Sequence, residues 1–329
     1  MRNSKGNPRR RANDEPKTHG PVNMEGITKE KLKSLIKGDI SFDVPMAEHT
    51  SLRVGGNAAA LAFPRDEEDL RELLLFARMS DIPYYVLGKG TNVIVRDKGF
   101  HGIVISLRRG FKGIRAMSRE GEEVLVSVEA GVDLRQLVRF TRKKNLAGLE
   151  AFVGIPGTVG GALAMNAGAF GSEMENVVKS IVLMKRSGSV VLKQREDLRF
   201  RYRHLALPEG AIILRATLEL KEAHEEAIVA KIEGFQKLRS QSQPWKLPSA
   251  GSVFKNPEGT PAGKLIEELG LKGHRIGGAR ISEKHGNFIV NEGDATAEEV
   301  LALIAFISDA VYEMRGVRLI PEVLIVGEE

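Results

Sequence analysis

Residues 154–171 read Gly-Ile-Pro-Gly-Thr-Val-Gly-Gly-Ala-Leu-Ala-Met-Asn-Ala-Gly-Ala-Phe-Gly. Six of these 18 residues are glycine. Glycine has no Cβ, so such a stretch lets another group approach at backbone distance. Close packing of a helix start against a sheet explains some of these glycines, but not their density. The stretch therefore predicts a surface for a large flat ligand that carries a diphosphate.

A second glycine-rich segment, Leu87-Gly-Lys-Gly-Thr-Asn92, lies between two strand-like runs. Its Gly-x-Gly pair resembles the start of a dinucleotide fingerprint. A strand rather than a helix follows it, so the requirement for a Rossmann motif is not met. The segment indicates a tight turn whose backbone N–H groups can bind phosphate oxygens, with a plain glycine-rich turn as the alternative.

Apolar spacing and capping residues predict several helices. One follows Asp66, with Asp69 in the capping-box position, and another follows Asp133. A third begins at Thr296, with Glu299 in the capping-box position, and ends at Gly316. Its apolar stripe is Val300, Leu303, Ile304, Ile307, Val311 and Met314. Two further helices are predicted at 225–240 and 262–269.

Short runs rich in Val and Ile predict strands, and most of them lie between residues 80 and 220. Few helices in this part of the chain can serve as crossovers, which favours an α+β fold over a regular parallel sheet. The predicted strands are Tyr84–Leu87, Val93–Val95, Ile103–Leu107, Val124–Glu129, Ile181–Met184, Val190–Leu192, Ile212–Leu220, Phe288–Asn291 and Val323–Val326.

The length of 329 residues predicts two or three domains, with boundaries near residues 82 and 222. The absence of cysteine excludes disulfides, thiolate nucleophiles, iron–sulfur clusters and cysteine-type zinc sites. No H-E-x-x-H string occurs and the histidines are scattered, so no metal is expected. No run approaches the roughly 18 apolar residues of a membrane helix, so no membrane span is expected.

The net charge of +6 is unevenly distributed. Residues 1–25 are basic and almost free of apolar side chains, which predicts a disordered, solvated tail rather than a nucleic-acid-binding arm. Residues 231–290 hold ten Lys and Arg against five Glu and no Asp, a net charge of +5. A segment of this charge suits an anionic ligand.

Three further motifs carry chemically useful groups. Ser252 lies in Ser249–Pro257, where no Gly-x-Ser-x-Gly string makes it a nucleophile. A serine without a base more often donates a hydrogen bond or a proton. Arg203 ends the run Phe200-Arg-Tyr-Arg, and Glu322 enters the last apolar strand. Burial of that carboxylate would be costly without a role or a partner.

In this order, the motifs resemble those of the UDP-N-acetylenolpyruvoylglucosamine reductases, also called UDP-N-acetylmuramate dehydrogenases. The resemblance runs from about His49 to Gly327. Four stretches carry it most specifically, and they are Gly88–Arg96, Gly154–Gly171, Gly251–Pro257 and Ile281–Asn291.

The resemblance implies a fold of the vanillyl-alcohol-oxidase (PCMH) type. It has two FAD-binding subdomains and a C-terminal α+β substrate domain. We assign the tail to residues 1–25 and the first subdomain to 26–81, completed by 317–329. The second subdomain is then 82–221, and the substrate-binding domain is 222–316.

The resemblance also implies the reaction. NADPH reduces a non-covalent FAD, which reduces the enolpyruvyl ether of a UDP-amino sugar to UDP-N-acetylmuramate, a peptidoglycan precursor. Such an enzyme works in the cytoplasm and serves cell-wall biogenesis. We expect no nucleic-acid or membrane partner, and we favour a monomer.

Residue by residue, the family pattern makes Ser252 the proton donor, with Arg203 and Glu322 flanking the substrate carboxylate. Lys255 can assist the serine, whose hydroxyl is a weak acid. The implied substrate contacts are Tyr202, Arg239, Lys255 and Asn256, with Lys246 as a weaker candidate. The implied cofactor contacts are Arg53, Leu87, Gly88, Lys89, Gly90, Thr91, Asn92, Gly154, Ile155, Pro156, Gly157, Thr158, Gly161, Ala162, Asn166 and Gly168.

The family has a longer subclass that closes a tyrosine-bearing loop over the substrate. Here none of the four tyrosines lies between Tyr202 and Tyr312, so the chain resembles the shorter subclass. Two alternatives stay open: a flavin-dependent alcohol oxidase or dehydrogenase of the same fold, and a non-catalytic flavin- or nucleotide-binding module.

Overall fold

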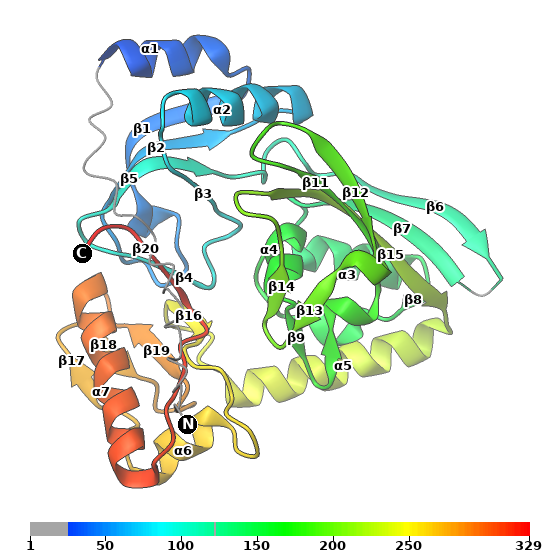
Figure 1. Cartoon of the computed structure of the whole chain (residues 1–329). Helices are drawn as coiled ribbons and strands as arrows, with labels where there is room; N and C mark the ends of the chain where they lie inside the picture. The colour runs from blue at the N-terminus through cyan, green and yellow to red at the C-terminus, as the bar shows by residue number, and fades with distance from the viewer. Residues whose placement is uncertain (1–25, 122) are drawn as a thin grey trace, which may run out of the picture.

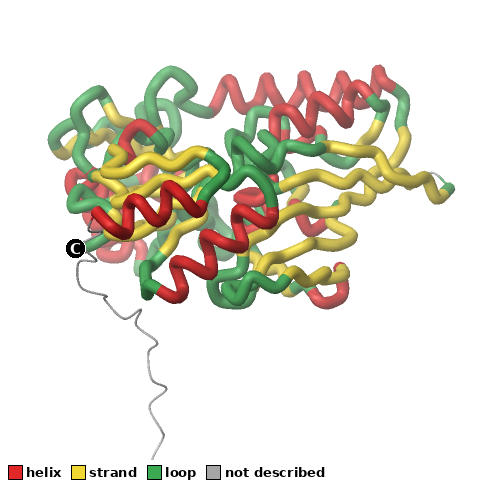
Figure 2. The backbone as a smooth tube through the Cα atoms, turned by 90° about the horizontal axis from the view of Figure 1, so that it is seen from above, coloured by secondary structure: helices red, strands yellow, loops and turns green. Residues whose placement is uncertain are grey.

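The computed structural model describes residues 26–121 and 123–329, and the predicted tail at 1–25 lies outside them. Three larger sheets with attached helices form this part of the chain (Figure 1). Figure 2 shows the strands of the second sheet gathered at the end of the molecule away from the C-terminus. Mixed and antiparallel sheets with packed helices confirm the predicted α+β class.

The first sheet has the strand order β1-β2-β5-β3, in which β2, β5 and β3 run parallel. Its strands are β1 Asp39–Pro45, β2 Asn57–Phe63, β3 Tyr84–Val86 and β5 Phe100–Ile105, and its helices are α1 Gly26–Leu35 and α2 Glu67–Met79. Helix α2 is the one predicted after Asp66, and its apolar stripe Leu70, Leu73, Leu74 and Ala77 is fully buried. Asp66 caps this helix, but Asp69 does not complete the capping box. Its carboxylate accepts N–H bonds from Lys37, Gly38 and Arg65 and so fixes the entry to β1.

This first sheet contains strands from both sides of residue 82, so the boundary predicted there divides a single sheet. The pairing of β3 and β5 with β2 is non-local, and local composition gives no sign of it. The connection after β5 separates two sheets, and we now propose the first boundary near residue 107.

The chain end returns to the first unit. Strand β20, Leu324–Val326, pairs in parallel with β4, Val93–Val95. Their side chains join a small apolar cluster that includes Val95 and Val326. Because β4 directly follows the Gly88–Asn92 loop, this pairing brings the chain around Glu322 next to that loop.

The second sheet has the order β12-β11-β15-β7-β6, with β8 paired to β15. Its strands are β6 Ile114–Glu120, β7 Glu123–Glu129, β8 Leu146–Ala147, β11 Val178–Met184, β12 Val190–Gln194 and β15 Ile212–Glu222. Helices α3 Leu134–Lys143, α4 Val159–Ala164 and α5 Glu225–Ser242 belong to this unit. Ile228 and Ile232 of α5 share its core, so the unit continues beyond the boundary predicted at 222, to about residue 242.

Two short hairpins lie beside the second sheet. The first joins β9 Gly168–Ala169 to β10 Ser172–Glu173, and the second joins β13 Arg199–Arg201 to β14 His204–Ala206. In the described part of the chain, four 3₁₀ turns complete the connections, at Met46–Glu48, Glu150–Phe152, Met174–Asn176 and Arg195–Asp197.

The third unit is an antiparallel sheet of order β16-β19-β18-β17 with two helices. Its elements are β16 Ser249–Ser252, α6 Ala262–Glu268, β17 Arg275–Ile276, β18 Ala279–Ile281, β19 Phe288–Asn291 and α7 Ala297–Arg315. The capping box of α7 and its C-terminal Gly316 are as predicted. Met314 is the exception in the predicted stripe. It is exposed, because the buried face of α7 ends one turn earlier, at Val311.

Candidate functional site

A cavity of about 750 Å³ lies where the three units meet. The loops Gly88–Asn92 and Ile155–Thr158 line it from the first two units. Strand β16 and the 285–288 segment line it from the third unit. Arg203 and Glu322 reach it from opposite sides, one from the hairpin β13–β14 and the other from the stretch before β20.

The two glycine-rich loops lie against each other. Thr91 Oγ1 donates to the Pro156 carbonyl at 3.0 Å. A Cβ on Gly88 would come within 2.7 Å of Thr158 Oγ1, and one on Gly90, at φ +65°, within 2.2 Å of the His49 carbonyl oxygen. Glycine is therefore required at both positions. Lys89 forms an ion pair with Asp133, which fixes the side chain at the tip of the loop.

Arg203 occupies the second position of the two-residue turn between β13 and β14, at φ +55°. That conformation is costly for a residue with a Cβ, and such strain is typical of functional sites. The guanidinium is fixed on three sides. Nε pairs with Glu322 Oε1 at 3.2 Å, Nη1 with Glu173 Oε1 at 3.0 Å, and Nη2 donates to the Gly168 carbonyl at 3.1 Å.

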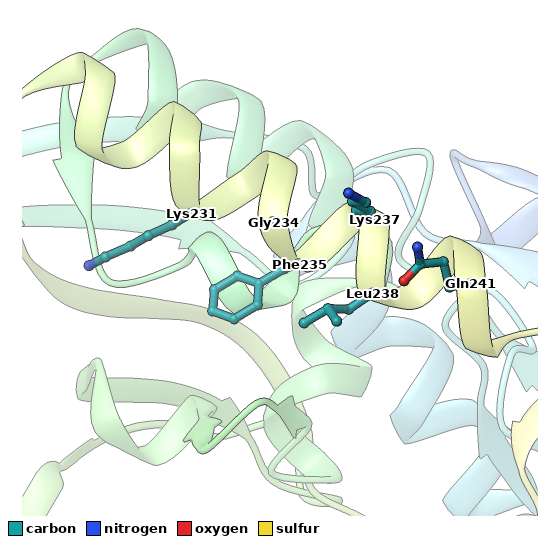
Figure 3. Close-up of a pocket in the computed structure, with 6 residues that line it drawn as sticks. All are labelled: Lys231, Gly234, Phe235, Lys237, Leu238 and Gln241. Atoms are coloured by element: carbon teal, nitrogen blue, oxygen red, sulfur yellow. The ribbon is translucent and has the colours of Figure 1, made fainter.

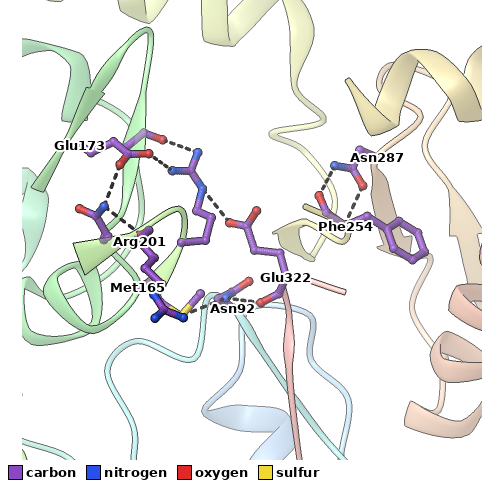
Figure 4. A network of polar contacts seen from close by, with 10 residues as sticks. Asn92, Met165, Glu173, Arg201, Phe254, Asn287 and Glu322 are labelled. Carbon is purple, nitrogen blue, oxygen red and sulfur yellow. Dashed lines mark hydrogen bonds and ion pairs between the residues drawn. The ribbon is translucent and has the colours of Figure 1, made fainter. Parts of the chain in front are cut away.

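Glu322 is held through its backbone as well as its carboxylate. Its N–H donates to the Val253 carbonyl at 2.8 Å, and its carbonyl accepts from Asn92 Nδ2 at 3.0 Å (Figure 4). Burial raises the pKa of the Glu322 carboxyl, and the charges of Arg203 and Lys255 oppose this rise. The group can therefore hold a proton at a higher pH than an ordinary glutamate.

Ser252 ends β16, directly before the residue that accepts from Glu322. A register shift between Ser249 and Ser252, with Gly251 at φ +77°, bends the strand there. Asn287 fixes Phe254, two residues after Ser252. The Asn287 side chain donates to the Phe254 carbonyl and accepts from the Phe254 N–H (Figure 4). Ser252 is thus held at the cavity wall, next in sequence to the residue whose carbonyl accepts from the Glu322 N–H.

Arg239 is a buried cation on α5, 6% exposed, that lines the cavity. Among the described residues, its guanidinium makes one long hydrogen bond, of 3.5 Å from Nη2 to the Ala151 carbonyl, and its Nε has no partner. The guanidinium lies 5.2 Å from the centre of the Phe170 ring. Burial lowers the pKa of this guanidinium. A buried cation without a carboxylate partner is suited to an anionic ligand.

Most of the predicted site residues line this one cavity. They are Gly88, Lys89, Gly90, Thr91, Asn92, Ile155, Pro156, Gly157, Thr158, Gly161, Ala162, Gly168, Tyr202, Arg203, Arg239, Ser252, Asn256 and Glu322. Asn256 also caps the start of α6, since its Oδ1 accepts from the Ala262 N–H at 3.0 Å.

Six predicted contacts do not line the cavity, namely Arg53, Leu87, Gly154, Asn166, Lys246 and Lys255. Arg53 is exposed and Leu87 is buried in the core. Gly154 lies against Arg239 and Trp245. Asn166 is 0% exposed, and its amide bonds to Glu173, Glu175 and Arg201, so we correct its assignment to the cofactor.

Sequence reasoning missed several lining residues, among them Phe170, Trp245, His285 and Asn287. Phe170, 44% exposed, and Trp245, 51% exposed, are aromatic side chains at the mouth of the cavity, and Trp245 Nε1 donates to the Arg239 carbonyl. The stretch Ile281–Asn291 carries part of the family resemblance, but nothing in its sequence indicates that Asn287 binds backbone or that His285 faces the cavity.

A shallower pocket of about 600 Å³ lies along α5 and is lined by Lys231, Gly234, Phe235, Lys237, Leu238 and Gln241 (Figure 3). It holds none of the residues from the motifs above. Among the described residues, no group of three or more His, Asp or Glu is placed to hold a metal ion. No helix within 26–121 or 123–329 is both long and apolar enough to cross a membrane.

Comparison with known proteins gives consistent matches. The family described as UDP-N-acetylenolpyruvoylglucosamine reductase, C-terminal domain, matches residues 243–326, and an FAD binding domain matches 58–192. The chain is 47% identical to the UDP-N-acetylenolpyruvoylglucosamine reductase of Syntrophus aciditrophicus (strain SB), over 94% of this chain and 99% of that protein. The corresponding protein of Clostridioides difficile (strain 630) is 42% identical over 94% of this chain and 100% of its own length.

A solved structure agrees. The UDP-N-acetylenolpyruvylglucosamine reductase of Thermus caldophilus superposes with a TM-score of 0.76 at 37% identity, covering 89% of this chain and 100% of that one.

Proposed function

Since the chain belongs to the UDP-N-acetylenolpyruvoylglucosamine reductase family, we propose that it reduces UDP-N-acetylglucosamine enolpyruvate to UDP-N-acetylmuramate in peptidoglycan precursor synthesis. The observation that carries the proposal is the convergence of Arg203, Ser252 and Glu322 on one cavity. Two glycine-containing loops border that cavity. A Cβ on Gly88 or Gly90 would clash, and Gly157 has a φ of +153°, which favours glycine.

The chain contains an FAD-binding domain, and its cavity fits the cofactor. The volume of about 750 Å³ lies in the range of about 300–1,000 Å³ usual for ligand sites. The loops Gly88–Asn92 and Ile155–Thr158 would hold FAD through their backbone. When bound, FAD supplies the hydride for the substrate, and we propose NADPH as the source of its electrons.

Arg203 and Glu322 act on the carboxylate side of the enolpyruvyl group. Addition of a hydride to the β-carbon leaves negative charge on that side. The fixed guanidinium of Arg203 stabilises this charge without having to reorganise. Glu322, with its raised pKa, can donate a hydrogen bond to the same carboxylate while it is protonated.

Ser252 delivers the proton that completes the reaction at the α-carbon. Its hydroxyl is a weak acid, so the transfer needs help from nearby charge. Lys255 lies outside the cavity wall, but its charge acts on Glu322, the neighbour of Ser252. We therefore assign Lys255 an electrostatic role in place of the direct contact expected from sequence.

We assign Arg239 to the diphosphate of the substrate, and this assignment predicts an unusual pair of effects. Arg239→Met should raise the KM for the UDP-sugar by about 10- to 100-fold, the value of a hydrogen bond to a charged group. Reduction of the flavin by NADPH should stay near wild type. Thermal unfolding of the variant should show an unchanged or higher midpoint, because the ligand-free protein loses an unpaired buried charge.

Lys237→Met is the matched control, because Lys237 is exposed on the same helix and lies outside the cavity. An unchanged KM in Arg239→Met would remove Arg239 from substrate binding. A large fall in its unfolding midpoint would contradict the description of Arg239 as a ligand-directed cation.

The family's longer subclass covers its substrate with a tyrosine-bearing loop, and we propose that residues 243–248 take that place here. Gln243, Pro244, Trp245, Leu247 and Pro248 of this segment border the cavity. The proposal rests on that position and on the bond from Trp245 to the Arg239 carbonyl.

All residues that we assign to the reaction come from one chain, so we propose that the enzyme works as a monomer. Its proposed substrates, NADPH and a UDP-sugar, are cytoplasmic metabolites, and we place the reaction in the cytoplasm.

Steady-state turnover tests the proposed function directly. The purified protein should oxidise NADPH over many turnovers only when the UDP-enolpyruvyl sugar is present. The product should be heavier than the substrate by two hydrogens in mass spectrometry. Consumption of NADPH that depends on oxygen but not on the sugar would instead favour the oxidase of the same fold.

A further inference from the structure

We infer that Glu173 is a positioning residue of this reaction, which holds the Arg203 guanidinium in place for the substrate carboxylate. The inference rests on the proposed function. Glu173 does not line the cavity and so does not contact the substrate. Its action passes through Arg203.

The contacts of Arg203 show why it needs such support. Its Nη1 pairs with Glu173 Oε1 at 3.0 Å, while its Nε pairs with Glu322 Oε1 at 3.2 Å. Without Glu173, its remaining acidic partner among the described residues is Glu322. Glu322 and the Gly168 carbonyl would then hold the guanidinium, which would turn toward Glu322 and away from the substrate.

Glu173 itself is firmly placed. It ends the hairpin β9–β10, whose turn residues Phe170 and Gly171 both have positive φ, as in a type I′ turn. Gly168 opposite has no room for a Cβ, which would meet the Ser172 carbonyl at 2.1 Å. The Gly168 carbonyl in turn accepts from Arg203 Nη2. One tight hairpin therefore supplies two of the three groups that hold the guanidinium.

Asn166 joins this hairpin to the turn that carries Arg203. Its buried amide donates to Glu173 Oε2 at 2.7 Å and to the Arg201 carbonyl at 3.2 Å, just before the turn. Asn166 thus helps to fix both the turn that carries Arg203 and the carboxylate that binds its guanidinium. This accounts for Asn166, whose predicted cofactor role the structure does not support.

Two carboxylates share the charge of Arg203, which couples Glu173 to Glu322. The other charged groups around them are Glu175, Arg195 and Lys255, from three different segments. Removing the charge of Glu173 leaves Arg203 to stabilise ionised Glu322 alone. The pKa of Glu322 should therefore fall, and the proton that Glu322 donates should be lost at lower pH.

The test compares Glu173→Gln with wild type and with Glu175→Gln. Glu175 belongs to the same network, through Asn166 and Arg195, but has no contact with Arg203. Both variants remove one negative charge from the same region. Reduction of the flavin by NADPH in each variant reports that the protein is folded and loaded.

In Glu173→Gln, the dissociation constant of the enolpyruvyl sugar should rise by about 10- to 100-fold, as for loss of a charge-assisted hydrogen bond. Binding of UDP-N-acetylglucosamine, which lacks the carboxylate, should not change. The alkaline limb of kcat/KM for the sugar should also move to lower pH. In Glu175→Gln, the dissociation constants of both sugars should stay within about fivefold of wild type, and the alkaline limb should stay in place.

The inference would be overturned if Glu173→Gln weakened binding of both sugars equally, or if Glu173→Gln and Glu175→Gln changed sugar binding equally. Glu173 would then be a structural residue. If Glu173→Gln fails to bind FAD, Glu173→Asp replaces it, because aspartate keeps the charge but shortens the side chain. The comparison of binding of the enolpyruvyl sugar and of UDP-N-acetylglucosamine then tests the inference in that variant. Failure of wild type to bind the enolpyruvyl sugar would instead refute the proposed function, so the two failures are distinguishable.

Discussion

Ser252→Ala is expected to abolish most of the reduction of the UDP-sugar while leaving reduction of the flavin by NADPH near wild type. The hydroxyl is the only group removed, and general-acid catalysis of this kind is worth about 10²- to 10⁴-fold in rate. Since the substrate keeps its contacts with Arg203 and Arg239, KM should change little. Rapid-mixing measurements of the two half-reactions separate these effects.

Ser249→Ala is the matched control, because it removes the same hydroxyl from the other end of β16. It should leave both half-reactions close to wild type. If Ser252→Ala slows both half-reactions equally, Ser252 has been given the wrong role and the loss reflects a disturbed cavity.

Glu322→Gln is the second variant with a large expected effect. Sugar reduction should fall by about 10²- to 10³-fold, because an amide N–H is a far weaker acid than a carboxyl O–H and donates a weaker hydrogen bond to the developing charge. The fold should survive, because Arg203 keeps its contacts with Glu173 and the Gly168 carbonyl. Normal turnover in this variant would remove Glu322 from the mechanism.

The raised pKa of Glu322 also makes the stability of the folded protein depend on pH. A carboxyl whose pKa is raised on folding stabilises the native state at low pH. That contribution is lost as pH rises through the folded-state pKa. Wild type should therefore lose stability over that range while Glu322→Gln does not. Chemical unfolding of both proteins across the range measures the difference.

The sequence was sufficient for the elements that local patterns define. The capped helix α7, the buried face of α2 and four strands of the second sheet (β7, β11, β12 and β15) follow from periodicity and turn chemistry, whereas β6 and β8 were not predicted. The prediction that Met314 belongs to the buried stripe of α7 was wrong, because spacing alone does not show where a helix leaves the core. The boundary at 82 failed because the parallel pairs of β5 with β2 and β3 are non-local.

In the candidate site too, local sequence patterns predicted some features, while features that depend on non-local contacts were missed. Arg203, Ser252 and Glu322 come from separate parts of the chain, and the family resemblance, not their spacing, predicted that they meet. Asn166 was assigned to the cofactor because it lies in the glycine-rich stretch. Its left-handed backbone, at φ +41°, turns it toward Glu173 instead. Glu173 carried no signal of its own, because a single glutamate after a turn is usually a surface residue.

The central claim is that one cavity takes electrons from NADPH through FAD and delivers them to a UDP-enolpyruvyl sugar. The most direct measurement is the anaerobic visible spectrum of the purified protein during successive addition of NADPH and that sugar. We predict flavin bands that bleach with NADPH and return with the sugar. Bands that return only with oxygen, or a colourless protein that does not take up added FAD, would contradict the claim.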